Sequence, residues 1–128
     1  TTQIWAAEPA NYDDTIRSLA SGRRERADTS QHSICDAIVT PQPGEMTFSI
    51  NQQTLAGGFA IEDSLVLQSM AAAFHHLKLV VEPGGAVALA AALDRRLPED
   101  ATCVVAVISG GNVDTDVFER ALASTPLL

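Results

Sequence analysis

The residues best suited to chemistry form the motif Ser-Gly-Gly-Asn at 109–112, directly after an apolar run rich in β-branched side chains. Such a run is typical of a buried parallel strand, predicted here over 103–108. Ligands of open α/β sheets bind beyond the carboxyl ends of the strands, where paired glycines let backbone amides approach closely. Spacing alone still favours a simple tight turn before the next helix, because short glycine motifs often match by chance.

A second group of polar residues, Glu8, Tyr12 and Asp14, follows a short apolar stretch near the start of the chain. Hard cations take oxygen ligands, including backbone carbonyl groups, so two carboxylates and the Tyr12 carbonyl could form a Mg²⁺ or Ca²⁺ site. Spacing alone favours a helix cap and a solvated acid instead. On either interpretation these residues lie just past the end of a predicted strand.

The elements that must position both groups alternate between strands and helices. Strands are predicted at about 2–7, 59–61 and 103–108, and helices at about 15–20, 45–55, 62–77, 84–96 and 116–124. Gly22 is expected to end the first helix, and Gly57-Gly58 to bound the second. This alternation predicts an α/β fold in a single domain, with an open, mostly parallel sheet and flanking helices.

The composition argues against several classes of partner. A chain of 128 residues with 46% hydrophobic and 19% charged residues fits one globular domain. A net charge of −8 argues against nucleic acid, which calls for a basic surface. No apolar run reaches transmembrane length and no signal peptide opens the chain, so we expect a cytoplasmic protein that does not bind membranes. Of the two cysteines, Cys35 falls in a polar loop, whereas Cys103 is expected in the core.

Three stretches together resemble a known enzyme family. They are "VVEPGGAVALAAAL" at 80–93, "VISGGNVD" at 107–114, and "AAEPANYDD" at 6–14. All three are similar to the fold-type II pyridoxal-phosphate enzymes, in particular the threonine/serine dehydratase and serine racemase group. The resemblance implies that the chain is part of the large domain of such an enzyme, with a tryptophan synthase β-like fold, and that its cofactor is pyridoxal 5'-phosphate.

The resemblance also implies roles for individual residues. Ser109 matches the serine that hydrogen-bonds the pyridine nitrogen of the cofactor, and Glu82 matches an acidic residue near the cofactor, our candidate catalytic residue. The cation site of serine racemase-like members maps onto Glu8, the Tyr12 carbonyl and Asp14, with Mg²⁺, Ca²⁺ or a monovalent ion as its occupant. The remaining cofactor-binding positions are Gly110, Gly111, Asn112 and Ala37. Much of the family has Asp-Gly where this chain has Asp36-Ala37, so a backbone with positive φ at residue 37 is in doubt.

Two features of the family are missing from the sequence. Such enzymes need a lysine that forms a Schiff base with the cofactor, and the single lysine, Lys78, lies outside the expected setting. No run of three or four glycines is present that could cradle the cofactor phosphate. We therefore expect that residues 1–128 are the C-terminal portion of a longer enzyme, and that the isolated chain is inactive.

The function implied for the intact enzyme is dehydration of a hydroxyamino acid. Water would be eliminated from threonine or serine, and ammonia would then be released to leave a 2-oxo acid. The alternatives are a serine or hydroxyaspartate racemase-dehydratase, or a stand-alone module that binds a small anion. The expected partners are the missing N-terminal portion and further copies, in a homodimer or homotetramer. If Leu128 is the true C-terminus, too few residues follow Asn112 for an effector domain, and isoleucine should not inhibit the enzyme.

Overall fold

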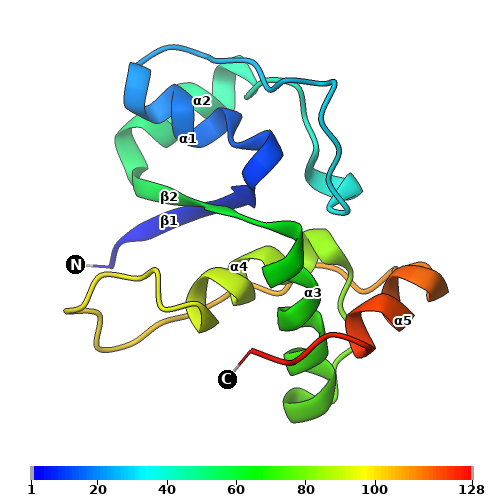
Figure 1. Ribbon diagram of the computed structural model, residues 1–128. Helices are drawn as coiled ribbons and strands as arrows, with labels where there is room; N and C mark the ends of the chain where they lie inside the picture. The colour runs from blue at the N-terminus through cyan, green and yellow to red at the C-terminus, as the bar shows by residue number, and fades with distance from the viewer. Residues whose placement is uncertain (1, 128) are drawn as a thin grey trace.

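Two parallel strands form the sheet of this protein, whose computed structural model describes residues 2–127 (Figure 1). Strand β1 (Ile4–Pro9) pairs with β2 (Leu55–Ile61), and the register sets Glu8 opposite Ala60. Because the strands are parallel, their carboxyl ends meet at one edge, and Glu8 lies there. Leu128, on which the expectation about isoleucine depends, lies outside the described residues.

Helices lie on both sides of the two strands (Figure 1). Helices α1 (Asp14–Ser21) and α2 (Glu45–Thr54) lie on one side. On the other side are α3 (Asp63–Ala72), α4 (Pro83–Leu93) and α5 (Thr115–Leu122). Short helical segments are η1 (Ala10–Tyr12), η2 (Asp36–Ile38) and the π-helical η3 (Ala73–Leu77), which extends α3. The predicted α/β architecture with flanking helices is therefore confirmed.

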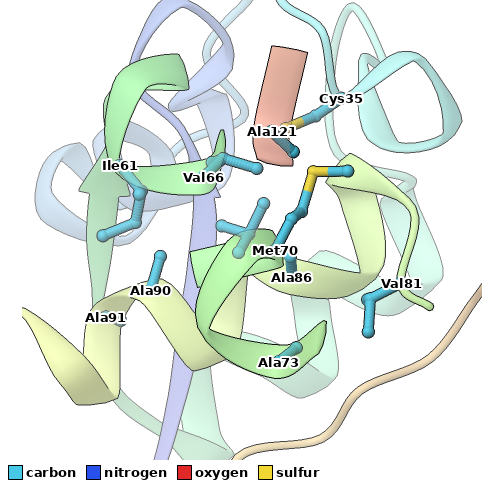
Figure 2. Close-up of a cluster of buried hydrophobic side chains, with 11 residues drawn as sticks. Cys35, Ile61, Val66, Met70, Ala73, Val81, Ala86, Ala90, Ala91 and Ala121 are labelled. Carbon is cyan, nitrogen blue, oxygen red and sulfur yellow. The ribbon is translucent and has the colours of Figure 1, made fainter. Parts of the chain in front are cut away.

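The largest buried cluster lies between α3 and α4, as Figure 2 shows. Met70 of α3 is fully buried there with Ala86 and Ala90 of α4, whose small side chains let the two helices approach closely. The buried hydroxyl of Ser69 donates to the carbonyl oxygen of Ala86 at 3.1 Å, so a hydrogen bond also joins the helices. This packing holds the N-terminus of α4 in place.

Local signals at helix ends were predicted well, but one glycine pair was not. Gly22 ends α1 in the left-handed region at φ 73°, as expected. Gly57 and Gly58, expected between elements, instead lie inside β2. A Cβ built on Gly57 would be 2.7 Å from the Trp5 ring, and one on Gly58 would be 2.7 Å from Ile16. These glycines make room for neighbouring side chains, so they do not interrupt the strand.

The predicted strand at 103–108 is wrong for the described part of the chain. No strand among residues 2–127 pairs with this segment, and a strand exists only through such pairing. Val105 and Val107 are 84% and 70% exposed, while Ala106 and Ile108 are half-buried, so one face alone packs on the core. Cys103 is exposed, against expectation.

Cys35 is also misplaced by the sequence, since its side chain is fully buried. The carboxylate of Asp63, at the start of α3, accepts hydrogen bonds from the Ser33 hydroxyl at 2.7 Å and from the Ile34 amide at 3.0 Å. These bonds hold a polar loop against the core and carry Cys35 inward. Among the described residues, no helix combines the length and apolar character needed to cross a membrane.

Candidate functional site

Two loops that are far apart in the sequence meet at the start of α4. The backbone N–H of Glu82 donates to the carbonyl oxygen of Gly110 at 3.0 Å. In return, the backbone N–H of Asn112 donates to the Glu82 carboxylate at 3.0 Å. The structure therefore brings together Glu82 and the turn formed by residues 109–112, as two of the sequence motifs required.

Glycine residues make this close contact possible. A Cβ built on Gly110 would lie 2.5 Å from the carboxyl carbon of Glu82, and one on Gly111 would lie 2.9 Å from the carbonyl oxygen of Val80. A Cβ on Gly85 would lie 2.8 Å from the backbone of Gly110. The first consequence of these glycines is that the two loops can pack against each other. That Gly110 and Gly111 also allow a close approach of a cofactor stays a prediction.

Ser109 and Asn112 project from the outer side of this contact. Both residues are exposed, and the Ser109 hydroxyl has no hydrogen-bond partner among residues 2–127. A hydroxyl group both donates and accepts hydrogen bonds, so Ser109 is able to bind a ring nitrogen or an anion. Its predicted role is thus compatible with its position.

Ala37 lies on the other side of the α4 N-terminus. Its Cβ is 3.5 Å from the position a Cβ on Gly84 would take, and it lines a hollow of about 400 Å³ together with Glu8 and Thr15. Among the described residues, the non-glycine residues with positive φ are Lys78 and Arg95, so Ala37 keeps an ordinary backbone. The sequence departure at Ala37 therefore introduces no backbone strain.

The carboxylate of Glu8 accepts hydrogen bonds from the first turn of α1. The Thr15 amide donates to it at 3.2 Å and the Ile16 amide at 3.0 Å. Glu8 thus satisfies two helix N–H groups that would otherwise have no partner, and its charge suits the positive end of the helix. Burial is nevertheless the main cause acting on the carboxyl group, and it raises the pKa of Glu8.

Asp14, the first residue of α1, is only 1% exposed. One carboxylate oxygen, Oδ2, is buried and has no hydrogen-bond partner among the described residues. Burial, the largest cause, raises the pKa of this carboxyl group, and the Arg17 guanidinium acts in the opposite direction. A buried acceptor without a donor is costly, and a cation would satisfy it.

Tyr12 connects Glu8 and Asp14 through the short helix η1. Its hydroxyl donates to the carbonyl oxygen of Gln31 at 3.1 Å, so its side chain is tied to the following loop. Within residues 2–127, no three His, Cys, Asp or Glu side chains are grouped so that they could hold a metal ion. The predicted site contains only two carboxylates and a backbone carbonyl, so this observation leaves the prediction untested.

Lys78 takes no part in either group of residues. It adopts the left-handed region at φ 61° after η3, and its ammonium group donates to the carbonyl oxygen of His75 at 2.8 Å. The structure therefore gives this lysine a role at a helix end. The residues that sequence reasoning missed are Val80, whose carbonyl requires Gly111, and the amide donors Thr15 and Ile16. No residue type or spacing marks a backbone group in this way.

Comparison with known proteins identifies the family. A family model described as "Pyridoxal-phosphate dependent enzyme" matches residues 1–110, which is most of the chain. The chain therefore belongs to the pyridoxal-phosphate-dependent enzymes. The Glu82 contact and most of the cation loop fall inside the matched region, so they belong to the part of the fold that this enzyme family shares.

Individual relatives support the same placement. The chain is 32% identical over 123 residues to a serine racemase of Dictyostelium discoideum, covering 94% of this chain and 38% of the relative. It is 28% identical over 120 residues to an L-threonine ammonia-lyase of Thermotoga maritima, covering 94% and 29%. The chain thus spans less than two fifths of the length of either relative.

A solved structure supports the family placement as well. The crystal structure of a threonine deaminase from T.th. is 35% identical to this pyridoxal-phosphate enzyme, with a TM-score of 0.82. The match covers 89% of this chain and 38% of the deaminase. Together with the family match, it confirms the predicted fold-type II α/β architecture.

Proposed function

We propose that residues 1–128 are the C-terminal portion of a pyridoxal-phosphate-dependent dehydratase that acts on a hydroxyamino acid such as threonine or serine. The observation that carries this proposal is the contact between Glu82 and the 109–112 turn, which presents an exposed Ser109 within a chain of this family. The named relatives include a threonine ammonia-lyase, which supports a lyase reaction. The products would be a 2-oxo acid and ammonia.

Pyridoxal phosphate, when bound, supplies an electron sink for the carbanion that forms at the substrate α-carbon. In this proposal the Ser109 hydroxyl holds the ring nitrogen. A neutral hydroxyl does not keep that nitrogen protonated as a carboxylate would, and this favours expulsion of the β-hydroxyl group. Glu82, Ala37 and the glycines of the turn line the pocket, and Asn112 supports the turn from its outer side.

The cation site is the second part of the proposal. We place Mg²⁺, Ca²⁺ or a monovalent ion between Glu8, the Tyr12 carbonyl and Asp14. The support is the buried Oδ2 of Asp14 without a partner among the described residues, and the raised pKa of both carboxyl groups, because a bound cation would satisfy the first and reverse the second. The ion would stabilise the loop that joins β1 to α1 and would not take part in bond breaking.

The remaining parts of the active site would come from elsewhere in the enzyme. Lys78 is engaged with the backbone of His75, so we propose that the lysine which bonds to the cofactor and the phosphate-binding loop lie in an N-terminal portion. The isolated chain would then be inactive. We further propose a homodimer or homotetramer, and we keep the cytoplasm as its compartment on composition alone.

Racemisation of serine is the second candidate, and the 32% identity to the Dictyostelium serine racemase favours it. The two reactions begin with removal of the same α-proton. They differ in whether the β-hydroxyl leaves or a proton returns on the opposite face. A single enzyme could therefore carry out both, and product analysis separates them.

The test is an assay of the full-length enzyme with L-threonine and L-serine, following 2-oxobutanoate, pyruvate and D-serine. Dehydration by the wild type is expected, with Ser109→Ala lowering turnover and Ser109→Asp changing the ratio of products. The isolated chain, mixed with pyridoxal phosphate, should form none of these products. Formation of D-serine alone would select the racemase, and unchanged rates and ratios in both Ser109 variants would refute its proposed role.

A further inference from the structure

Glu82 occupies the N-cap position of α4, but its side chain does not cap that helix. The carboxylate instead crosses to the other loop and accepts the Asn112 N–H, a contact between residues thirty positions apart. The backbone N–H of Glu82 donates to the carbonyl oxygen of Gly110 in the same loop. Main chain and side chain of one residue thus hold both ends of the Gly110–Asn112 segment.

Gly110 is fitted to this carboxylate. A Cβ at this position would lie 2.5 Å from both the carboxyl carbon and Oε1 of Glu82, closer than real atoms approach. Among the described residues, the glycines with positive φ are Gly22 and Gly57, so the backbone of Gly110 would accept another residue. The space taken by the Glu82 side chain is therefore the reason why a larger residue does not fit at position 110.

We infer that Glu82 is a positioning residue: its carboxylate fixes the 109–112 turn against the N-terminus of α4, and so sets the place of the Ser109 hydroxyl. The side chain acts as a hydrogen-bond acceptor of defined length, and no proton transfer by Glu82 is needed. The inference rests on the proposed function only for the role of Ser109. It replaces a catalytic part for Glu82 with a mechanical one.

Acceptor, length and charge can be separated by substitution. Glu82→Gln keeps an acceptor oxygen at the same distance, whereas Glu82→Asp keeps the charge but is one methylene shorter. Glu82→Ala removes the group. Glu62 provides the matched control, because it is the N-cap residue of α3 and its side chain makes no cap hydrogen bond. Glu62→Ala should leave the 109–112 turn unchanged.

Hydrogen exchange of the Asn112 amide, measured by NMR on the full chain of the enzyme, reports the contact directly. Loss of a hydrogen bond to a charged group should accelerate exchange on the order of tenfold in Glu82→Ala and Glu82→Asp. Exchange in Glu82→Gln and Glu62→Ala should stay near the wild-type rate. If Glu82→Ala does not fold, the Asp and Gln variants still give the comparison. Equal rates in Glu82→Asp and the wild type would overturn the inference.

A double-mutant cycle tests the steric part. Gly110→Ala should accelerate exchange at Asn112 by displacing the carboxylate, but should add little when Glu82 is already alanine. Independent effects of the two substitutions would contradict the inference. Absorbance of the cofactor in the holoenzyme separates this result from the proposed function. If the cycle is coupled but Ser109→Ala leaves the cofactor spectrum unchanged, Glu82 still positions the turn and only the role of Ser109 fails.

Discussion

Replacement of Asp14 by asparagine is expected to stabilise the protein when no cation is present. The side chain is 1% exposed, and its Oδ2 atom has no hydrogen-bond partner among the described residues. Burial raises the pKa of the carboxyl group, which means that the folded state disfavours its ionised form. An amide of the same shape removes the charge, so Asp14→Asn should increase the free energy of unfolding.

The size of the effect follows from opposing contributions. A buried polar atom without a partner costs about 1–3 kcal/mol, and more when it is charged. Asp14 begins α1, where a negative charge is favourable by about 0.3–1 kcal/mol, and this part is lost in Asp14→Asn. The amide also leaves a polar group in the same place. We therefore expect a net gain of about 1 kcal/mol near neutral pH, or roughly 4 °C in melting temperature.

The pH dependence has a defined sign. The folded-state pKa values of Asp14 and Glu8 are both raised. Their contributions to stability are therefore fully present below the unfolded-state pKa, at about pH 4, and are lost as the pH rises through the higher folded-state values. Without a cation, these two groups make the wild type less stable from about pH 4 upward. Asp14→Asn should lose less stability over the same interval.

Thermal unfolding of the full chain between about pH 4 and pH 7, first with a chelator, measures this difference. Asp13→Asn is the control, because Asp13 pairs with Arg17 at 2.7 Å and its loss should lower stability by a few tenths of a kcal/mol. Added Mg²⁺, Ca²⁺ or K⁺ should then stabilise the wild type but not Asp14→Asn. The reasoning is refuted if Asp14→Asn is the less stable protein in chelator near neutral pH. Equal shifts of both proteins with every ion would remove the proposed site.

Three further predictions concern packing and exposure. Ser69→Ala should lower the free energy of unfolding by about 1 kcal/mol in denaturant titrations, because its buried hydroxyl bonds a carbonyl of α4. Val105→Thr with Val107→Thr should leave that free energy within about 0.5 kcal/mol, because both side chains are exposed, and should reduce self-association of the isolated chain in sedimentation. Iodoacetamide should label Cys103 and spare Cys35, since burial raises the pKa of the Cys35 thiol to about 12. Peptide mapping that finds native Cys35 labelled would contradict its burial.

Local features of the fold could be predicted because they depend on neighbouring residues. Gly22 ends α1 since glycine adopts positive φ without strain, and the small residues of α4 signal close packing wherever that helix lies. The parallel sheet followed from the order of strands and helices alone. The resemblance added the pairing of Glu82 with the 109–112 turn, which no local pattern contains.

Features set by distant contacts could not be predicted. Cys35 is buried because Asp63 binds the loop beside it, although the loop sequence itself is polar. The glycines at 110 and 111 were interpreted as space for a ligand, whereas the structure shows that they make space for Glu82 and for the carbonyl of Val80. Both interpretations predict a glycine at these positions. Only coordinates distinguish a neighbour within the protein from a ligand.

The segment at 103–108 shows how a wrong prediction can still be informative. Its alternating exposure, with Ala106 and Ile108 half-buried and Val105 and Val107 exposed, has the period of a strand although no strand pairs with it among residues 2–127. Strands of parallel sheets are covered on both faces, and their run of β-branched residues is selected for that environment. The sequence therefore encodes neighbours that these residues do not supply, which supports our proposal that another portion of the enzyme completes the sheet beside Ser109.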